Sequence, residues 1–292
     1  MSWGGQSEVL SLKHVLLKHP GDAFGDPETM TEEWQKLNYL KMPDLERARE
    51  EHQEFRELLE RLGASVELLP ALPETGMDSI YVRDAALMTD RGAILCKMGK
   101  ETRAGEPQAQ GAHYERMEIP VLGEITGHGR LEGGDFLWLD EKTAAVGRGY
   151  RTNDEGIRQL RAFLGEEVEL LVVPLPHWKG PWDVFHLMSV ISPIAEDLAL
   201  VYSPLLPVPF REFLLARGME LVEVPDEEFE SMGCNVLALA PRVCVALEGN
   251  PVTRERLEAA GAQVHTYRGE EISVPGSGGP TCLTRPLVRS AA

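Results

Sequence analysis

The residues of this chain best suited to covalent catalysis are a cysteine, a histidine and several carboxylates. Cys282 follows a Gly-Gly-Pro turn in GGPTCLTRPL, close to the end of the sequence. Taken alone, such a cysteine is more often a small buried hydrophobe than a nucleophile. The turn in front of Cys282, and its place in the repeat described below, favour a reactive thiol. We therefore predict that Cys282 is the nucleophile.

His186 is the candidate general acid and base. It precedes an apolar run in FHLMSV, a context in which a lone histidine is usually a satisfied core residue. Beside a cysteine, imidazole is the natural proton carrier because its pKa lies near neutrality. The other histidines lie in charged or loop-like contexts and receive no role.

Two acidic pairs accompany them. Glu132 and Asp135 flank two glycines in RLEGGDF, and Asp78 and Asp84 lie six residues apart in DSIYVRDAAL. If the second segment is a strand, this even spacing puts both carboxylates on one face. Inward-facing carboxylates are costly unless a cation pairs with them, and guanidinium is the planar cation that carboxylates bind bidentately. A bound cation would also lower the pKa of a neighbouring cysteine.

A recurring unit must position these residues. Each copy has two strand-like apolar runs, an amphipathic helix and a third strand, and copies begin near residues 78, 133, 182 and 233. One more interval of about 50 residues leads to Cys282. Cys282 thus holds the place in its unit that Glu132, His186 and Asn235 hold in theirs.

The last unit stops after one strand, and its missing parts occur at the other end of the chain. A strand at 9–20, a helix at 43–62 and a strand at 64–70 would complete it. We therefore predict an α/β fold of five units closed in a ring, with a pseudo-fivefold axis, sealed by pairing of the N- and C-terminal segments. We expect residues 1–292 to form one domain. A linear solenoid is the alternative, but it normally carries polar capping repeats.

Local signals support this division. Helices are expected at 152–165, opened by a capping box from Thr152 to Glu155, and at 250–261, opened by Asn250 and Pro251. In a closed ring, side chains at one end of equivalent strands converge on the axis. The cysteine, the histidine and the carboxylates should therefore meet in one central cleft.

Composition excludes several classes of protein. A net charge of −18, from 47 acidic and 29 basic residues, argues against nucleic acid as a partner. The sequence lacks an apolar run long enough for a membrane span and a signal-peptide pattern at its start. Its cysteines form no CxxC pair, so we expect no metal site, no disulfide framework and a reducing cytoplasm. We interpret three of them as structural: Cys96, Cys234 and Cys244.

Four ordered motifs resemble the guanidine-modifying enzyme superfamily, the penteins, which includes amidinotransferases and deiminases. They are YVRD, LEGGD, FHLMS and GGPTCLT. The resemblance spans roughly 9–288. It implies a five-bladed α/β-propeller that acts on a small guanidino molecule without a metal or organic cofactor. It also implies the catalytic residues Cys282, His186, Glu132 and Asp84.

Within the superfamily, the dimethylarginine dimethylaminohydrolases look most similar. Their Asp-x5-Asp substrate motif is matched by Asp78 and Asp84, and their two arginines for the substrate carboxylate are matched by Arg103 and Arg151. Asp135 is assigned to substrate binding. The resemblance thus implies hydrolysis of N-methylated arginine to citrulline and an alkylamine, through a covalent thiouronium intermediate.

Two positions bear on the choice of substrate. Arginine deiminases usually carry an Asp two residues after the histidine, whereas this chain has Met188, which we expect to pack against an N-methyl group. Arg83 precedes Asp84, where many dimethylaminohydrolases have an acidic residue. An arginine deiminase, an amidinotransferase that passes the amidino group to an amine, and a non-catalytic arginine binder remain alternatives. A homo-oligomer also remains open.

Overall fold

The computed structural model describes residues 3–183 and 185–291. Its strands form five three-stranded sheets. In every sheet the central strand pairs antiparallel with one neighbour and parallel with the other. The strands, grouped by sheet, are β15 (Arg285–Ser290), β1 (Ser11–Leu17) and β2 (Ser65–Leu68); β3 (Ala86–Thr89), β4 (Gly92–Leu95) and β5 (Val121–Glu124); β6 (Phe136–Asp140), β7 (Thr143–Arg148) and β8 (Glu169–Pro174); β9 (Ile191–Ala195), β10 (Leu198–Val201) and β11 (Glu220–Glu223); and β12 (Val236–Ala240), β13 (Val243–Leu247) and β14 (Gln263–Tyr267).

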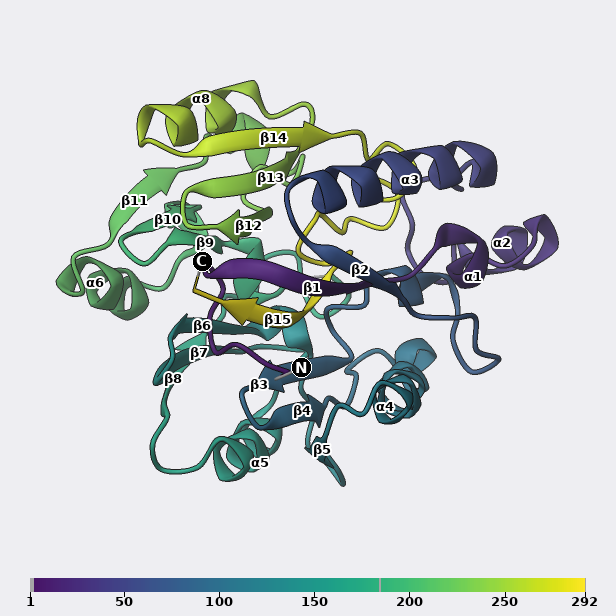
Figure 1. Cartoon of the computed structure of the whole chain (residues 1–292), viewed down its shortest axis with the longest axis horizontal. Helices are drawn as coiled ribbons and strands as arrows, with labels where there is room; N and C mark the ends of the chain where they lie inside the picture. The colour runs from purple at the N-terminus through teal and green to yellow at the C-terminus, as the bar shows by residue number, and fades with distance from the viewer. Residues whose placement is uncertain (1–2, 184, 292) are drawn as a thin grey trace.

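The longer helices lie at the periphery of the sheets (Figure 1). The α-helices are α1 (Pro20–Ala23), α2 (Pro27–Glu33), α3 (Leu45–Arg61), α4 (Glu106–Arg116), α5 (Asp154–Leu164), α6 (Val208–Ala216), α7 (Asp226–Phe229) and α8 (Pro251–Ala259). Short 3-10 helices are η1 (Met77–Ile80), η2 (Glu101–Arg103), η3 (Gly133–Asp135), η4 (Leu187–Ser189) and η5 (Ser203–Leu205). Among the described residues, no helix combines the length and apolar character that a membrane crossing needs.

The two ends of the chain share one sheet, as predicted. Strand β1 pairs antiparallel with β15 and parallel with β2, and Figure 1 shows these first and last strands side by side. Side chains then join the sheets to one another. Trp138 of β6 donates to Met88 O of β3, and Arg289 of β15 donates to Ala238 O of β12. Ser192 of β9 bonds the backbone on either side of the start of β12. The prediction of five units with paired chain ends is confirmed.

The residues that precede the first strand of each unit are not themselves in strands. Asp78 lies in η1, and Asp84 lies in the turn before β3. His186 precedes η4 instead of heading a strand. The prediction that Asp78 and Asp84 share a face of one strand is therefore wrong, because the chain turns between them, and both residues line one cavity. Val184, inside the apolar run predicted at 182–202, lies outside the described residues.

One helix start differs by a residue from its prediction. The N-cap residue of α5 is Asn153 instead of Thr152, and the Asn153 side chain accepts a hydrogen bond from Gly156 N. Thr152 instead accepts from Glu132 N at 3.3 Å. The hydroxyl is thus used to hold the carboxylate-bearing loop next to the helix.

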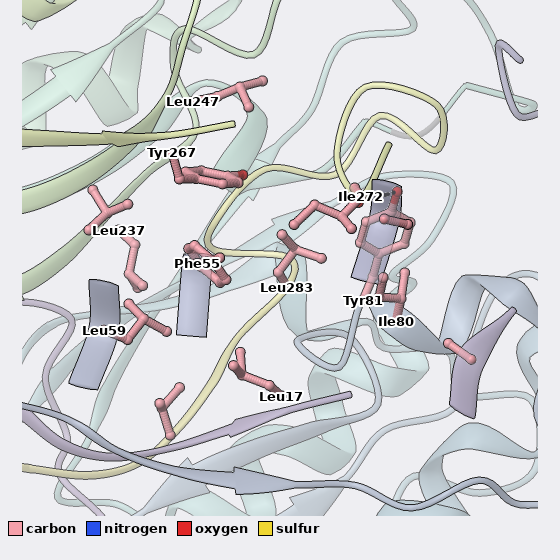
Figure 2. Packing of buried hydrophobic residues seen from close by; sticks show 14 of the residues in the cluster. Leu17, Phe55, Leu59, Ile80, Tyr81, Leu237, Leu247, Tyr267, Ile272 and Leu283 are labelled. Carbon is pink, nitrogen blue, oxygen red and sulfur yellow. Dashed lines mark hydrogen bonds between the residues drawn. The ribbon is translucent and has the colours of Figure 1, made fainter. Parts of the chain in front are cut away.

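A buried cluster supports the C-terminal segment that carries Cys282. It joins β1, α3, η1, β12, β13 and β14, and Figure 2 shows Phe55, Tyr267, Ile272 and Leu283 packed within it. Glu51 of α3 accepts hydrogen bonds from the backbone of this segment at residues 271 and 272. The segment between β14 and β15 is therefore fixed by apolar packing and by a buried carboxylate.

Candidate active site

The glycines before Cys282 allow close packing of its loop. A Cβ at Gly278 would overlap the ring of Tyr81, and a Cβ at Gly279 would lie 2.6 Å from the amide of Asn235. Larger side chains at either position would push the loop outward. The Gly-Gly-Pro turn therefore sets the depth at which the thiol enters the ring.

The thiol of Cys282 is partly exposed and hydrogen-bonded. Asn235 Nδ2 donates to Cys282 Sγ at 3.4 Å, while Asn235 Oδ1 accepts from the backbone and hydroxyl of Thr281. Burial and the negative charge of Asp84 raise the pKa of the Cys282 thiol, and the bond from Asn235 opposes that rise. The free site therefore holds a neutral thiol that a bound cation would help to ionise.

His186 and Glu132 form a buried pair. His186 Nε2 lies 2.7 Å from Glu132 Oε2, and Glu132 is fully buried. The other Glu132 oxygen accepts from Gly99 N at 2.7 Å and from Arg151 Nη1 at 3.3 Å. These contacts hold the carboxylate in place, so that it can in turn orient the imidazole.

Neighbouring carboxylates keep His186 charged. Burial alone would lower the pKa of the imidazole, but Asp84, Asp135 and Glu132 outweigh burial and raise it to about 9. Burial likewise opposes ionisation of Glu132, yet His186 and Arg151 hold its pKa well below the usual range. At neutral pH the pair is therefore an imidazolium and a carboxylate.

The two aspartates predicted to bind substrate are each paired with a cation of the protein. Asp84 Oδ2 lies 2.7 Å from Arg103 Nη1, and Asp84 Oδ1 accepts from Gly134 N at 2.9 Å. Asp78 Oδ2 lies 2.5 Å from Lys100 Nζ. Each carboxylate oxygen has two lone pairs, so these contacts leave capacity for a substrate cation.

Arg103 is the more constrained of the two predicted arginines. All three of its nitrogens donate to protein acceptors, among them both oxygens of Glu106 and Tyr81 O. Arg151 donates only weakly, to Glu132 at 3.3 and 3.5 Å. In this structure Arg103 is the counter-ion of Asp84 and Glu106.

Two cavities meet at the thiol and the imidazole. The first, of about 160 Å³, is lined by charged residues that include Asp78, Asp84, Arg103 and Arg151. The second, of about 220 Å³, has a mixed wall in which three aromatic rings lie beside charged and polar residues. Both are lined by Cys282 and His186, together with three residues of the surrounding loops: Leu40, Asp183 and Ser277. A substrate in the first cavity can therefore present its reacting carbon at the junction.

The cluster of Asp84, Glu132 and His186 has the residue types of a metal site. One ligand atom from each lies within 4.8 Å of the others. However, Glu132 already bonds His186, and Arg103 already pairs with Asp84. The raised pKa of His186 also favours imidazolium, which binds no metal. These three side chains are therefore better arranged to hold a proton on His186 than to bind a metal ion.

Two predicted positions lie away from the cavities. Asp135 is fully buried and accepts from Leu187 N at 3.0 Å, which fixes the start of η4 beside His186. Met188 is buried in the apolar cluster between β6, β9 and α6, and it lines neither cavity. The expectation that Met188 packs against an N-methyl group is therefore wrong, because the turn of η4 directs it into the core.

Three residues that shape the site have no predicted role. Asn235 bonds the thiol, Lys100 pairs with Asp78, and Glu106 pairs with Arg103. Asn235 could have been found, because it holds the same place in its unit as Glu132, His186 and Cys282. Lys100 and Glu106 carry no such signal, since their contacts arise from η2 and α4 folding back over the turn at residues 78–84.

Comparisons with known proteins agree with this arrangement. A family model described as "N,N dimethylarginine dimethylhydrolase, eukaryotic" matches residues 28–289. The chain is 28% identical over 277 residues to N(G),N(G)-dimethylarginine dimethylaminohydrolase of Pseudomonas aeruginosa, covering 93% of this chain and 98% of that enzyme. It is 30% identical over 253 residues to the uncharacterized protein YkgA of Bacillus subtilis, covering 83% and 80%.

A solved structure shows the same fold. A cysteine-to-serine mutant of the Pseudomonas aeruginosa enzyme, complexed with citrulline, matches with a TM-score of 0.75 and 24% identity, over 94% of this chain and 98% of that one. The family match covers most of the residues that form the five sheets. The chain therefore belongs to the dimethylarginine dimethylaminohydrolase family and is a hydrolase that acts on C–N bonds of linear amidines.

Proposed function

We propose that this protein hydrolyses Nω-methylated arginine to citrulline and an alkylamine, with Cys282 as nucleophile. Membership of the family and the likeness to the Pseudomonas aeruginosa enzyme support this substrate. The observation that carries the proposal is the junction of the two cavities. There a thiol and an imidazolium adjoin a pocket lined by Asp78 and Asp84.

Substrate binding uses the charges of the first cavity. The guanidinium lies against the carboxylate of Asp84 and is attracted by the nearby Glu132, and Asp78 extends the negative surface. We assign the substrate carboxylate to Arg151, with Arg103 as the second predicted ligand. Since Arg103 also neutralises Asp84 and Glu106, its main contribution is to hold Asp84 in place.

The first chemical step forms the covalent intermediate. The bound guanidinium lowers the pKa of the Cys282 thiol, which releases its proton to water, and the resulting thiolate attacks the guanidino carbon. The bond from that carbon to the methylated nitrogen breaks, and His186 supplies the proton that the departing amine needs. The products of this step are a thiouronium on Cys282 and a free alkylamine.

The second step releases citrulline. His186, now neutral, takes a proton from water, and the water oxygen attacks the thiouronium carbon. The C–S bond then breaks, so that the thiol is restored and the ureido group is formed. The carboxylate of Glu132 stabilises the imidazolium at each stage.

Substrate turnover tests this proposal. We expect kcat/KM for Nω-methylarginine to exceed that for arginine by at least about tenfold, which needs only about 1.4 kcal/mol of differential transition-state stabilisation. Release of citrulline and methylamine in equal amounts is the readout. A preference for arginine would support the deiminase alternative, and amidino transfer to an added amine would support the amidinotransferase alternative.

A further inference from the structure

The second cavity has no role in the proposed reaction. Its volume is about 220 Å³, and it adjoins the charged first cavity at Cys282 and His186, which line both. A substrate whose amino-acid end fills the first cavity points its guanidino carbon at the thiol. Any group beyond the departing nitrogen must then extend into the second cavity.

Part of the wall of this cavity is apolar. Trp178, Phe185, Phe229 and Met232 line it, beside polar residues such as Ser189. The ring of Phe229 contacts two others. The Tyr202 ring stacks on it, with 3.9 Å between the ring centroids, and the Trp178 ring meets it edge-on, with 6.2 Å between the centroids. Aromatic pairs of this kind form rigid apolar surfaces. This part of the wall is therefore suited to an apolar group.

Two of the charged residues that line it form an ion pair. Lys179 Nζ lies 2.6 Å from Glu230 Oε2, and the same ammonium lies over the Trp178 ring. This ion pair adds no net charge to the cavity, and it places the stem of Lys179 against the aromatic part of the wall. Asp183, which also lines the first cavity, lies at the junction of the two.

Two wall residues adopt backbone conformations that are rare for side chains with a Cβ. Trp178 has φ 43°, and Met232 has φ 63°. Neither is a glycine, asparagine or aspartate, so each conformation costs free energy that the surrounding structure must offset. Such positions cluster at ligand sites, and here both are in the wall of one cavity.

We propose that the second cavity binds the substituent on the departing nitrogen, so that the substrate class extends to Nω-alkyl and Nω-arylalkyl arginines. This inference rests on the proposed function. Attack by Cys282 breaks the bond between the guanidino carbon and the substituted nitrogen. The substituted nitrogen keeps its alkyl or arylalkyl group and gains a proton through His186, and it leaves as the primary amine. Water then completes the hydrolysis to citrulline.

Size supports a substituent larger than methyl. A cavity of about 150 Å³ is enough to bind benzene, and this one is larger. A methyl group would leave most of the space to water, whereas a benzyl group would contact the rings of Trp178 and Phe229. We therefore expect kcat/KM for Nω-benzylarginine to lie within tenfold of the value for Nω-methylarginine.

Paired variants test the location of the substituent. Phe229→Trp should narrow the cavity and lower the ratio of benzyl to methyl kcat/KM at least tenfold. Phe213→Trp is the matched control, because Phe213 is a partly buried ring on α6 outside both cavities. It should leave the ratio unchanged. Benzylamine and citrulline released in equal amounts are the readout.

Two results would overturn the inference alone. One is that the wild type turns over Nω-methylarginine, but its kcat/KM for Nω-benzylarginine is more than tenfold lower. The other is an equal fall of the ratio in both variants. Absence of turnover with every Nω-substituted arginine would instead overturn the proposed function, and the inference with it.

Discussion

Three carboxylates around one imidazole decide the protonation of the site. Asp84, Asp135 and Glu132 together overcome the burial of His186 and raise its pKa to about 9. The same negative charge of Asp84 helps to keep Cys282 neutral until a cation arrives. Under the proposed mechanism, the free enzyme therefore holds His186 in its acid form, and binding of the cationic substrate generates the nucleophile.

The raised pKa of His186 predicts a pH dependence of stability. Its stabilising contribution is complete below pH 6.5, the ordinary pKa, and is lost as pH rises through about 9. A shift of this size corresponds to roughly 3 kcal/mol. We expect Glu132→Gln to flatten the fall in the free energy of unfolding between pH 7 and 9.5, because one of the three carboxylates is removed.

Urea unfolding across this pH range provides the measurement. Glu124→Gln is the control, since Glu124 is exposed at the end of β5. It should keep the wild-type slope. An identical slope for wild type and Glu132→Gln would contradict the assignment of the charge to His186.

At the scale of elements, the Glu-Gly-Gly-Asp turn sets the spacing between the imidazole of His186 and the carboxylate of Asp84. A Cβ at Gly134 would lie 2.6 Å from His186 Nδ1 and 2.9 Å from Asp84 Oδ1. The backbone of η3 therefore fits directly between these two side chains. Only glycine allows this contact without moving one of them.

Gly134→Ala should consequently impair catalysis more than folding. We expect kcat/KM to fall about a hundredfold, as small misplacements of catalytic groups typically cause. Gly149→Ala is the control, because its Cβ would meet only Leu175 at 3.3 Å and farther. Steady-state kinetics and thermal unfolding of both variants measure the two effects. Near-normal activity of Gly134→Ala would show that the site tolerates the displacement.

The sequence predicted the repeating elements well because their signals are local. The helix expected at 43–62 is observed as Leu45–Arg61, with Asp44 capping its first turn. The prediction of a strand at 78–87 was wrong, because it relied on the apolar residues of this segment. These residues are buried in a 3-10 helix and turns that pack against other parts of the chain. Such tertiary packing does not produce the alternation of apolar and polar residues by which a strand is recognised.

The contacts between side chains of the site were harder to predict than the residues that form it. Order along the chain brought Cys282, His186, Glu132 and Asp84 together. It did not reveal that Arg103 pairs with Asp84, because that contact depends on how η2 packs against the turn before β3. The direction of Met188 depends in the same way on η4. Side-chain direction in short 3-10 turns has no sequence period from which to read it.

For the whole molecule, pairing of the chain ends makes the last strand part of the core. Leu287 of β15 is 1% exposed and packs in a cluster with residues of β3 and β4. It therefore joins two blades that are distant in sequence. Loss of its contacts should be felt by the entire ring.

Leu287→Ala should lower the free energy of unfolding by about 2–5 kcal/mol, the usual cost of a buried leucine. Leu215→Ala on α6, where the side chain is 46% exposed, is the control and should change it by less than about 0.5 kcal/mol. Urea unfolding followed by both circular dichroism and tryptophan fluorescence is the measurement. A small loss, or transitions that no longer coincide, would indicate that the C-terminal strand is peripheral.

The proposed nucleophile of this guanidino hydrolase is Cys282. The most direct test of its role is the turnover of Nω-methylarginine by Cys282→Ser, compared with Cys244→Ser, whose cysteine is buried in β13. Because serine supplies no accessible anion near neutral pH, we predict a loss on the order of a thousandfold or more for Cys282→Ser. We expect near wild-type turnover for Cys244→Ser. Retention of turnover by a folded Cys282→Ser variant would contradict the account.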